Sequence, residues 1–111
     1  MRQEIRTEDQ TRTVEARVPA QDIAAILGIV ERIKFIQFRP HYSCATTDCA
    51  TLALSVRISG FAKRVKAYGP EYIASHPFGL QRQQDSQDMQ GFVELWDRIH
   101  RHLPRVEVCR A

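Results

Sequence analysis

Residues 51–68 constrain the fold of this chain more than any other stretch, because they read TLALSVRISGFAKRVKAY. Apolar and polar side chains alternate on both sides of Ser59 and Gly60, the period of strands with one buried face, and Ser-Gly is a turn signal. The pattern predicts a β-hairpin of strands 51–58 and 61–68, at the centre or on one edge of a sheet. Its outward face is predicted to carry Arg57, Arg64, Lys66 and Tyr68.

The other segments are predicted from the period of two that is typical of strands and the period of 3.6 that is typical of helices. TRTVEARVP, residues 11–19, alternates as a strand, and the chain after Pro19 carries an amphipathic helical pattern to about residue 35. Gly28 interrupts that helix, so we expect a close neighbour there. DSQDMQGFVELWDRIHRHLP predicts a second helix, with Met89, Phe92, Val93, Trp96, Ile99 and Leu103 on one face, and RVEVCRA a possible last strand.

The order β-α-β-β-α, with a possible last β, predicts an α+β fold in two layers. We expect an antiparallel sheet of three to four strands packed against two amphipathic helices. Residues 1–10 are polar and unpatterned, which predicts a flexible N-terminal arm before a single domain over residues 11–111. Of the 111 residues 43% are hydrophobic, enough for one core, and no apolar run is long enough to span a membrane.

The loop HYSCATTDCA, residues 41–50, carries the residues most suited to chemistry. His41, Cys44, Asp48 and Cys49 could bind zinc, but no second cysteine pair follows, so His41, Cys44 and Cys49 are weak metal candidates. A local disulfide between Cys44 and Cys49 is the simpler interpretation. Such a bridge would favour a periplasmic or secreted protein, and reduced thiols would favour the cytoplasm.

Two regions are candidate binding surfaces. The connection GPEYIASHPFGLQR, residues 69–82, is long for a small domain, is predicted to hold a short helical turn, and offers Tyr72, His76 and Phe78 to a protein partner. The basic strand surface of Arg57, Arg64 and Lys66 could contact nucleic acid. Solvated strand charges explain it as well, and Tyr68 is the one aromatic residue there. Another protein is therefore the favoured partner.

The segment from Ala20 to about Leu103 resembles a family of small bacterial domains of unknown function, often exported. The resemblance rests on a helix ending in IKFIQF, the stretch TTDCATLALSVRISGFAKRVKAYG and a late amphipathic helix. The layout is also similar to emfourin, a small bacterial inhibitor of thermolysin-like metalloproteases. Both resemblances imply a non-enzymatic module, and they favour a location in the bacterial envelope.

The sequence contains no recognisable catalytic constellation, and we predict no cofactor. The expected function is a non-enzymatic protein-binding domain. The alternatives are a metal- or thiol-dependent site at the loop of His41, Cys44 and Cys49, a nucleic-acid binder, and a protease-inhibitor-like module.

Overall fold

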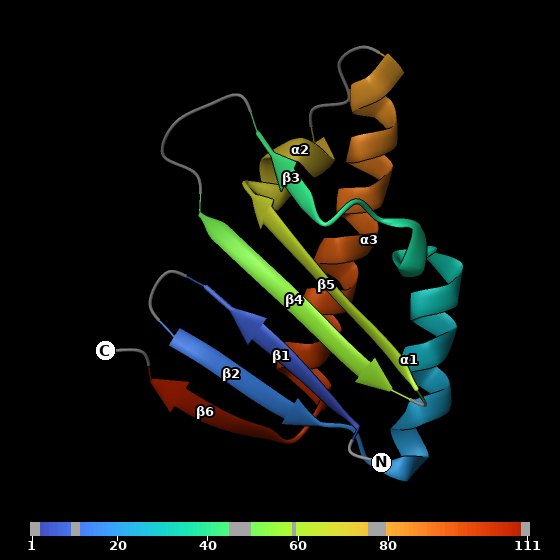
Figure 1. Cartoon of the computed structure of the whole chain (residues 1–111), viewed down its shortest axis with the longest axis vertical. Coiled ribbons are helices and arrows are strands. Elements are labelled where there is room, and N and C mark those ends of the chain that lie inside the picture. The colour runs from blue at the N-terminus through green and yellow to red at the C-terminus, as the bar shows by residue number, and fades with distance from the viewer. Residues whose placement is uncertain (1–2, 10–11, 45–49, 59, 76–79, 110–111) are drawn as a thin grey trace.

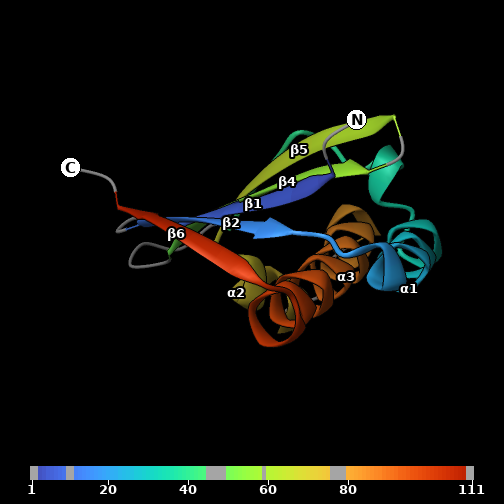
Figure 2. The same cartoon turned by 90° about the horizontal axis from the view of Figure 1, so that it is seen from below.

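The structure, a computed structural model, describes residues 3–9, 12–44, 50–58, 60–75 and 80–109. Within these ranges one six-stranded sheet has the strand order β3-β5-β4-β1-β2-β6. The helices all lie on one side of this sheet (Figure 1, Figure 2). The elements are β1 (Glu4–Glu8), β2 (Arg12–Arg17), α1 (Ala20–Arg32), the 3-10 turn η1 (Phe35–Gln37), β3 (His41–Ser43), β4 (Thr51–Ile58), β5 (Phe61–Tyr68), α2 (Pro70–Ser75), α3 (Leu80–His102) and β6 (Arg105–Cys109).

The hairpin of β4 and β5 has the bounds that the alternating pattern predicts. The strands pair antiparallel, with Leu54 opposite Val65 and Ser55 opposite Arg64. Leu54, Ile58 and Val65 are fully buried, because every second side chain points towards the helices. The polar positions between them point to the other side of the sheet.

The predicted flexible arm is wrong for residues 4–8, which form strand β1 in the interior of the sheet. β1 pairs antiparallel with β2 on one side and with β4 on the other. Ile5 is fully buried and Thr7 is 2% exposed, so this short strand contributes to the core. The segment offers one strongly apolar side chain in five residues, too weak an alternation to indicate a strand without its partners.

The α+β class is confirmed, whereas the predicted number and pairing of elements need correction. The sheet has more than four strands and is mixed, because β3 runs parallel to β5 at one edge. β3 spans only three residues, which is below the length at which a period of two can be recognised. The short α2 corresponds to the helical turn expected after Gly69, and α3 begins at Leu80, five residues before the segment DSQDMQGFVELWDRIHRHLP in which the helix was predicted.

Helix α3 lies along the covered face of the sheet and contributes most of the helical core. Met89, Phe92, Leu95 and Ile99 are fully buried, while Trp96 is only partly buried against them. Leu95, which the sequence pattern left off the buried face of this helix, therefore belongs to the core, whereas Trp96, which it placed on that face, is only partly buried. None of the described helices is both long and apolar enough to cross a membrane.

Two helical glycines have opposite surroundings. A Cβ atom built on Gly28 in α1 meets nothing within 4 Å, so the close neighbour expected there is not found. A Cβ atom on Gly91 in α3 would lie 2.8 Å from both Cβ and Cγ2 of Ile33. Gly91, not Gly28, is the position at which the end of α1 approaches another helix.

Candidate functional site

One face of the sheet is not covered by any helix in the described part of the chain (Figure 2). We call it the open face. The strand registers place five basic and three acidic side chains on it. These are Arg6, Arg17, Arg57, Arg64 and Lys66, with Glu4, Glu8 and Glu15. Basic charge is therefore in excess on this face.

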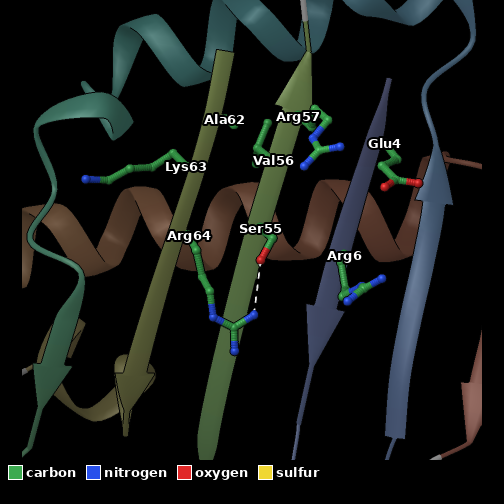
Figure 3. A pocket seen from close by; sticks show the side chains of 8 residues that line it. All are labelled: Glu4, Arg6, Ser55, Val56, Arg57, Ala62, Lys63 and Arg64. Carbon is green, nitrogen blue, oxygen red and sulfur yellow. Dashed lines mark hydrogen bonds between the residues drawn. The ribbon is translucent and has the colours of Figure 1, made fainter. Parts of the chain in front are cut away.

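A hollow of about 360 Å³ lies on the open face, and Figure 3 shows its lining. We call it the Ser55 hollow. It forms because Ser55 and Ala62 are short, whereas the surrounding arginines are long. The lining residues come from β1, β4 and β5: Glu4, Arg6, Ser55, Val56, Arg57, Ala62, Lys63 and Arg64.

The registers set these side chains in rows across the sheet. Arg6 of β1 and Arg64 of β5 are both directly opposite Ser55 of β4. In the next row, Arg57 is opposite Glu4 on one side and Ala62 on the other. Neighbouring strands lie about 4.8 Å apart and residues i and i+2 about 6.7 Å apart. Three arginines therefore start from backbone positions that surround one serine.

Arg64 is held in place by two neighbours. Its Nη1 donates to Oε1 of Glu8 at 3.0 Å and to Oγ of Ser55 at 3.2 Å, and its Nη2 donates to Oε2 of Glu8 at 3.3 Å. This forked pairing fixes the plane of the guanidinium group. The Glu8 side chain is only 9% exposed although it lies on the open face, whereas Arg64 is 51% exposed. Glu8 therefore fixes the guanidinium group of Arg64, while about half of the Arg64 side chain stays exposed to solvent.

Arg6 is oriented in a similar way, because its Nη2 donates to Oε1 of Glu15 on β2. The Arg6 side chain is 47% exposed. Arg57 is exposed and makes no ion pair with another described residue. In Figure 3 the guanidinium group of Arg64 lies next to Ser55, that of Arg57 is directed towards the side of Glu4, and that of Arg6 lies on the side of β1 that faces Glu15 of β2. The hollow is thus lined by two arginines that are held by glutamates, Arg6 and Arg64, and by Arg57, which has no such ion pair within the described residues.

The chemistry of this arrangement is that of binding. Ser55 is the one hydroxyl in the hollow, and its oxygen accepts a hydrogen bond from Arg64. A guanidinium group stays protonated in proteins and cannot act as a base, so Arg64 does not activate the serine as a nucleophile. Guanidinium groups bind carboxylates and phosphates well, because their donors match the geometry of those anions.

The structure brings together part of the basic surface expected from sequence. Arg57 and Arg64 line the Ser55 hollow, and Lys66 lies one row beyond Arg64 on the same face. Sequence reasoning missed Arg6 and Glu4, because they belong to the strand that was predicted as an arm. EIRTE does place Ile5 and Thr7 on one side and charged residues on the other, but five residues with one strongly apolar side chain are too short a pattern to have identified them.

The loop of His41, Cys44 and Cys49 does not form a described site. His41 is exposed on the edge strand β3, whereas Cys44 is buried and its backbone N–H donates to the carbonyl of Tyr68. Asp48 and Cys49 lie outside the described residues, and so does the predicted Cys44–Cys49 disulfide. Among the described residues, no group of three or more potential ligands could hold a metal ion.

The expected protein-binding connection is described only in part. His76 and Phe78 lie outside the described residues. Tyr72 of α2 is half-buried and lines a second hollow, of about 410 Å³, together with Leu52 and Trp96. Asp9 and Glu71 also line this second hollow. It shares no lining residue with the Ser55 hollow.

A polar cluster at the end of β3 stabilises the fold. The Tyr42 hydroxyl donates to Oδ2 of Asp88 at 2.7 Å and accepts from the backbone N–H of Arg39 at 3.1 Å. Burial and, next in size, the hydrogen bond to Asp88 together raise the pKa of Tyr42 from 10.0 to about 12. Arg39 also pairs with Asp85 at 2.7 Å. These bonds fasten the edge strand β3 to α3.

The functional proposal below is based on the residues of the chain itself. No family model, no curated protein and no solved structure matches this sequence.

Proposed function

We propose that this chain is a non-enzymatic binding domain that docks an acidic protein on the open face of its sheet. The observation that carries the proposal is the excess of basic side chains on a sheet face that the described helices leave uncovered, grouped around the Ser55 hollow. An acidic partner complements that charge, and complementary charge accelerates encounter and suppresses wrong partners.

The way in which the arginines are held supports binding to a folded or extended protein surface. Glu8 and Glu15 fix Arg64 and Arg6 before any partner arrives, so less side-chain entropy is lost on association. Arginine is also among the residues enriched at protein interfaces and among those that dominate binding energy. Lysines and arginines without such bracing would lose more freedom for each bond that they form.

The test is a titration of the isotope-labelled protein with poly-L-glutamate, followed by NMR at low and at moderate salt. We expect the amide signals of β1, β4 and β5 to shift, and the binding to weaken with salt because exposed charges are screened. Poly-L-lysine is the control polymer. Shifts confined to the helical side, or no binding of poly-L-glutamate at low salt, would contradict the proposal.

A matched pair of variants makes the test specific. Lys66→Gln removes one charge from the open face, and Lys34→Gln removes one exposed lysine beside η1. We expect Lys66→Gln to weaken binding by about threefold, the size of one exposed ion pair, and Lys34→Gln to leave it unchanged. Equal effects of the two substitutions would mean that binding responds only to net charge. If a single-stranded oligonucleotide binds the open face more tightly than poly-L-glutamate does, the partner is a nucleic acid and not an acidic protein.

A further inference from the structure

We propose that the Ser55 hollow is a subsite for a phosphomonoester group, so that the acidic partner is recognised at a phosphorylated side chain. This inference rests on the proposed function, because it specifies the part of the open face that recognises the partner. The ligand is defined by its chemistry as a tetrahedral dianion at the end of a side chain.

The arginines of the hollow retain hydrogen-bond donors that a ligand could use. A guanidinium group carries five N–H donors. The bonds described above use three donors of Arg64 and one of Arg6. Arg57 makes no ion pair within the described residues. The donors that remain belong to arginines of three different strands, and all three arginines line the hollow (Figure 3).

The shape of the donor set fits a phosphate group better than a carboxylate. A phosphomonoester presents three acceptor oxygens that point in different directions, whereas a carboxylate presents two oxygens in one plane. Arg6 and Arg64 start two strands apart, about 9.6 Å at the backbone, and Arg57 starts one row away. A tetrahedral group in the hollow can direct a separate oxygen towards each of the three arginines, whereas the two oxygens of a carboxylate are confined to one plane.

The charge of the open face also fits a dianion. Five basic and three acidic side chains lie on this face, which leaves an excess of two positive charges. A phosphomonoester carries about −1.5 to −2 charges at neutral pH. Glu4 lines the hollow and opposes an anion there, so its carboxylate provides a test with the opposite sign.

The experiment uses three glutamate-rich peptides of one sequence, with phosphoserine, serine or glutamate at the central position. Affinities are measured by calorimetry on the whole chain, and the arginine side-chain N–H signals are followed by NMR. We expect the phosphoserine peptide to bind about tenfold more tightly than the serine peptide, since charge-assisted bonds to several guanidinium groups add to its affinity. The glutamate peptide should resemble the serine peptide.

Two variants on the hollow separate geometry from charge. Arg57→Lys keeps the charge and removes the forked donor set, so it should abolish most of the preference for phosphoserine and leave the serine peptide unaffected. Glu4→Gln removes the opposing carboxylate and should strengthen binding of the phosphoserine peptide. Lys66→Gln is the matched control, because it lies outside the hollow and should weaken all three peptides alike.

The outcomes distinguish this inference from the proposed function. If all three peptides bind the open face equally, or if glutamate replaces phosphoserine without loss, the phosphate subsite is refuted and the acidic-partner proposal stands. If the phosphoserine peptide shifts only the basic end of α3 at His100, Arg101 and His102, the subsite is likewise refuted. If none of the peptides binds at low salt, both proposals fail.

Discussion

Replacing Gly91 by alanine should destabilise the protein, although alanine is the better helix former. A Cβ atom at this position would lie 2.8 Å from Cβ and Cγ2 of Ile33 and 3.3 Å from its Cδ1. The Cβ atom of Ile33 is fixed to the backbone, so no change of rotamer can relieve that contact. The end of α1 must therefore move away from α3, and the core between them must repack.

The matched control is Gly28→Ala, because a Cβ atom there meets nothing within 4 Å. In a helix interior the change from glycine to alanine stabilises by about 1 kcal/mol. Gly28→Ala should gain that amount, which corresponds to roughly 4 °C in Tm for a domain of this size. Gly91→Ala gains the same propensity term but adds an overpacking cost of about 1–3 kcal/mol. It should therefore lose up to about 2 kcal/mol against the wild type.

Urea denaturation of both variants, followed by circular dichroism, measures the difference directly. The result that would refute the reasoning is a Gly91→Ala variant as stable as Gly28→Ala, because then α1 and α3 would not be in close contact. An Ile33→Ala background adds a check on the source of the cost. That substitution removes two of the three close atoms, so Gly91→Ala should cost less there than in the wild type.

Three further predictions concern other parts of the fold. Since the pKa of Tyr42 is raised from 10.0 to about 12, the unfolded chain loses this proton first. The free energy of unfolding of the protein should therefore fall as the pH rises from about 10 to about 12, and it should fall less steeply in the Tyr42→Phe variant. Equal slopes of the two proteins, measured by urea denaturation across this pH range, would contradict the prediction. Ser86→Ala removes the 2.8 Å bond from its hydroxyl to the carbonyl of Ala74, and should cost about 1 kcal/mol and speed amide exchange in α2. Unchanged exchange would show that the bond does not hold α2. Ile36→Ser should leave stability within about 0.5 kcal/mol, because Ile36 is 63% exposed, and a larger loss on thermal denaturation would mean that it is covered.

The sequence was most informative where one short segment contains its own pairing partner. β4 and β5 alternate over eight residues each and are joined by a turn, so their bounds could be predicted. β1 and β3 could not, because both are short and each also pairs with a strand that is not its neighbour in the chain. β1 pairs with β4 about fifty residues away, and β3 pairs in parallel with β5. A period of two in three to five residues does not distinguish a strand from a loop.

The candidate site follows the same division. Arg57 and Arg64 could be placed on one face from the hairpin alone, because their positions follow from strand alternation. The third arginine of the hollow could not be predicted, because Arg6 reaches Ser55 only through the pairing of β1 with β4. The bracing of Arg64 by Glu8 depends on that same pairing. A sequence pattern gives the face of a side chain, and the neighbours on that face depend on which strands meet.

The interior position of β1 also has a consequence for the order of folding. During synthesis β1 and β2 leave the ribosome first, and a two-stranded hairpin by itself is at best marginally stable in water. β1 finds its second neighbour only when Thr51–Ile58 has been made, and β2 must wait for Arg105–Cys109. Since pairings between distant segments are costly to close, this domain should fold slowly for its size and after most of the chain has emerged.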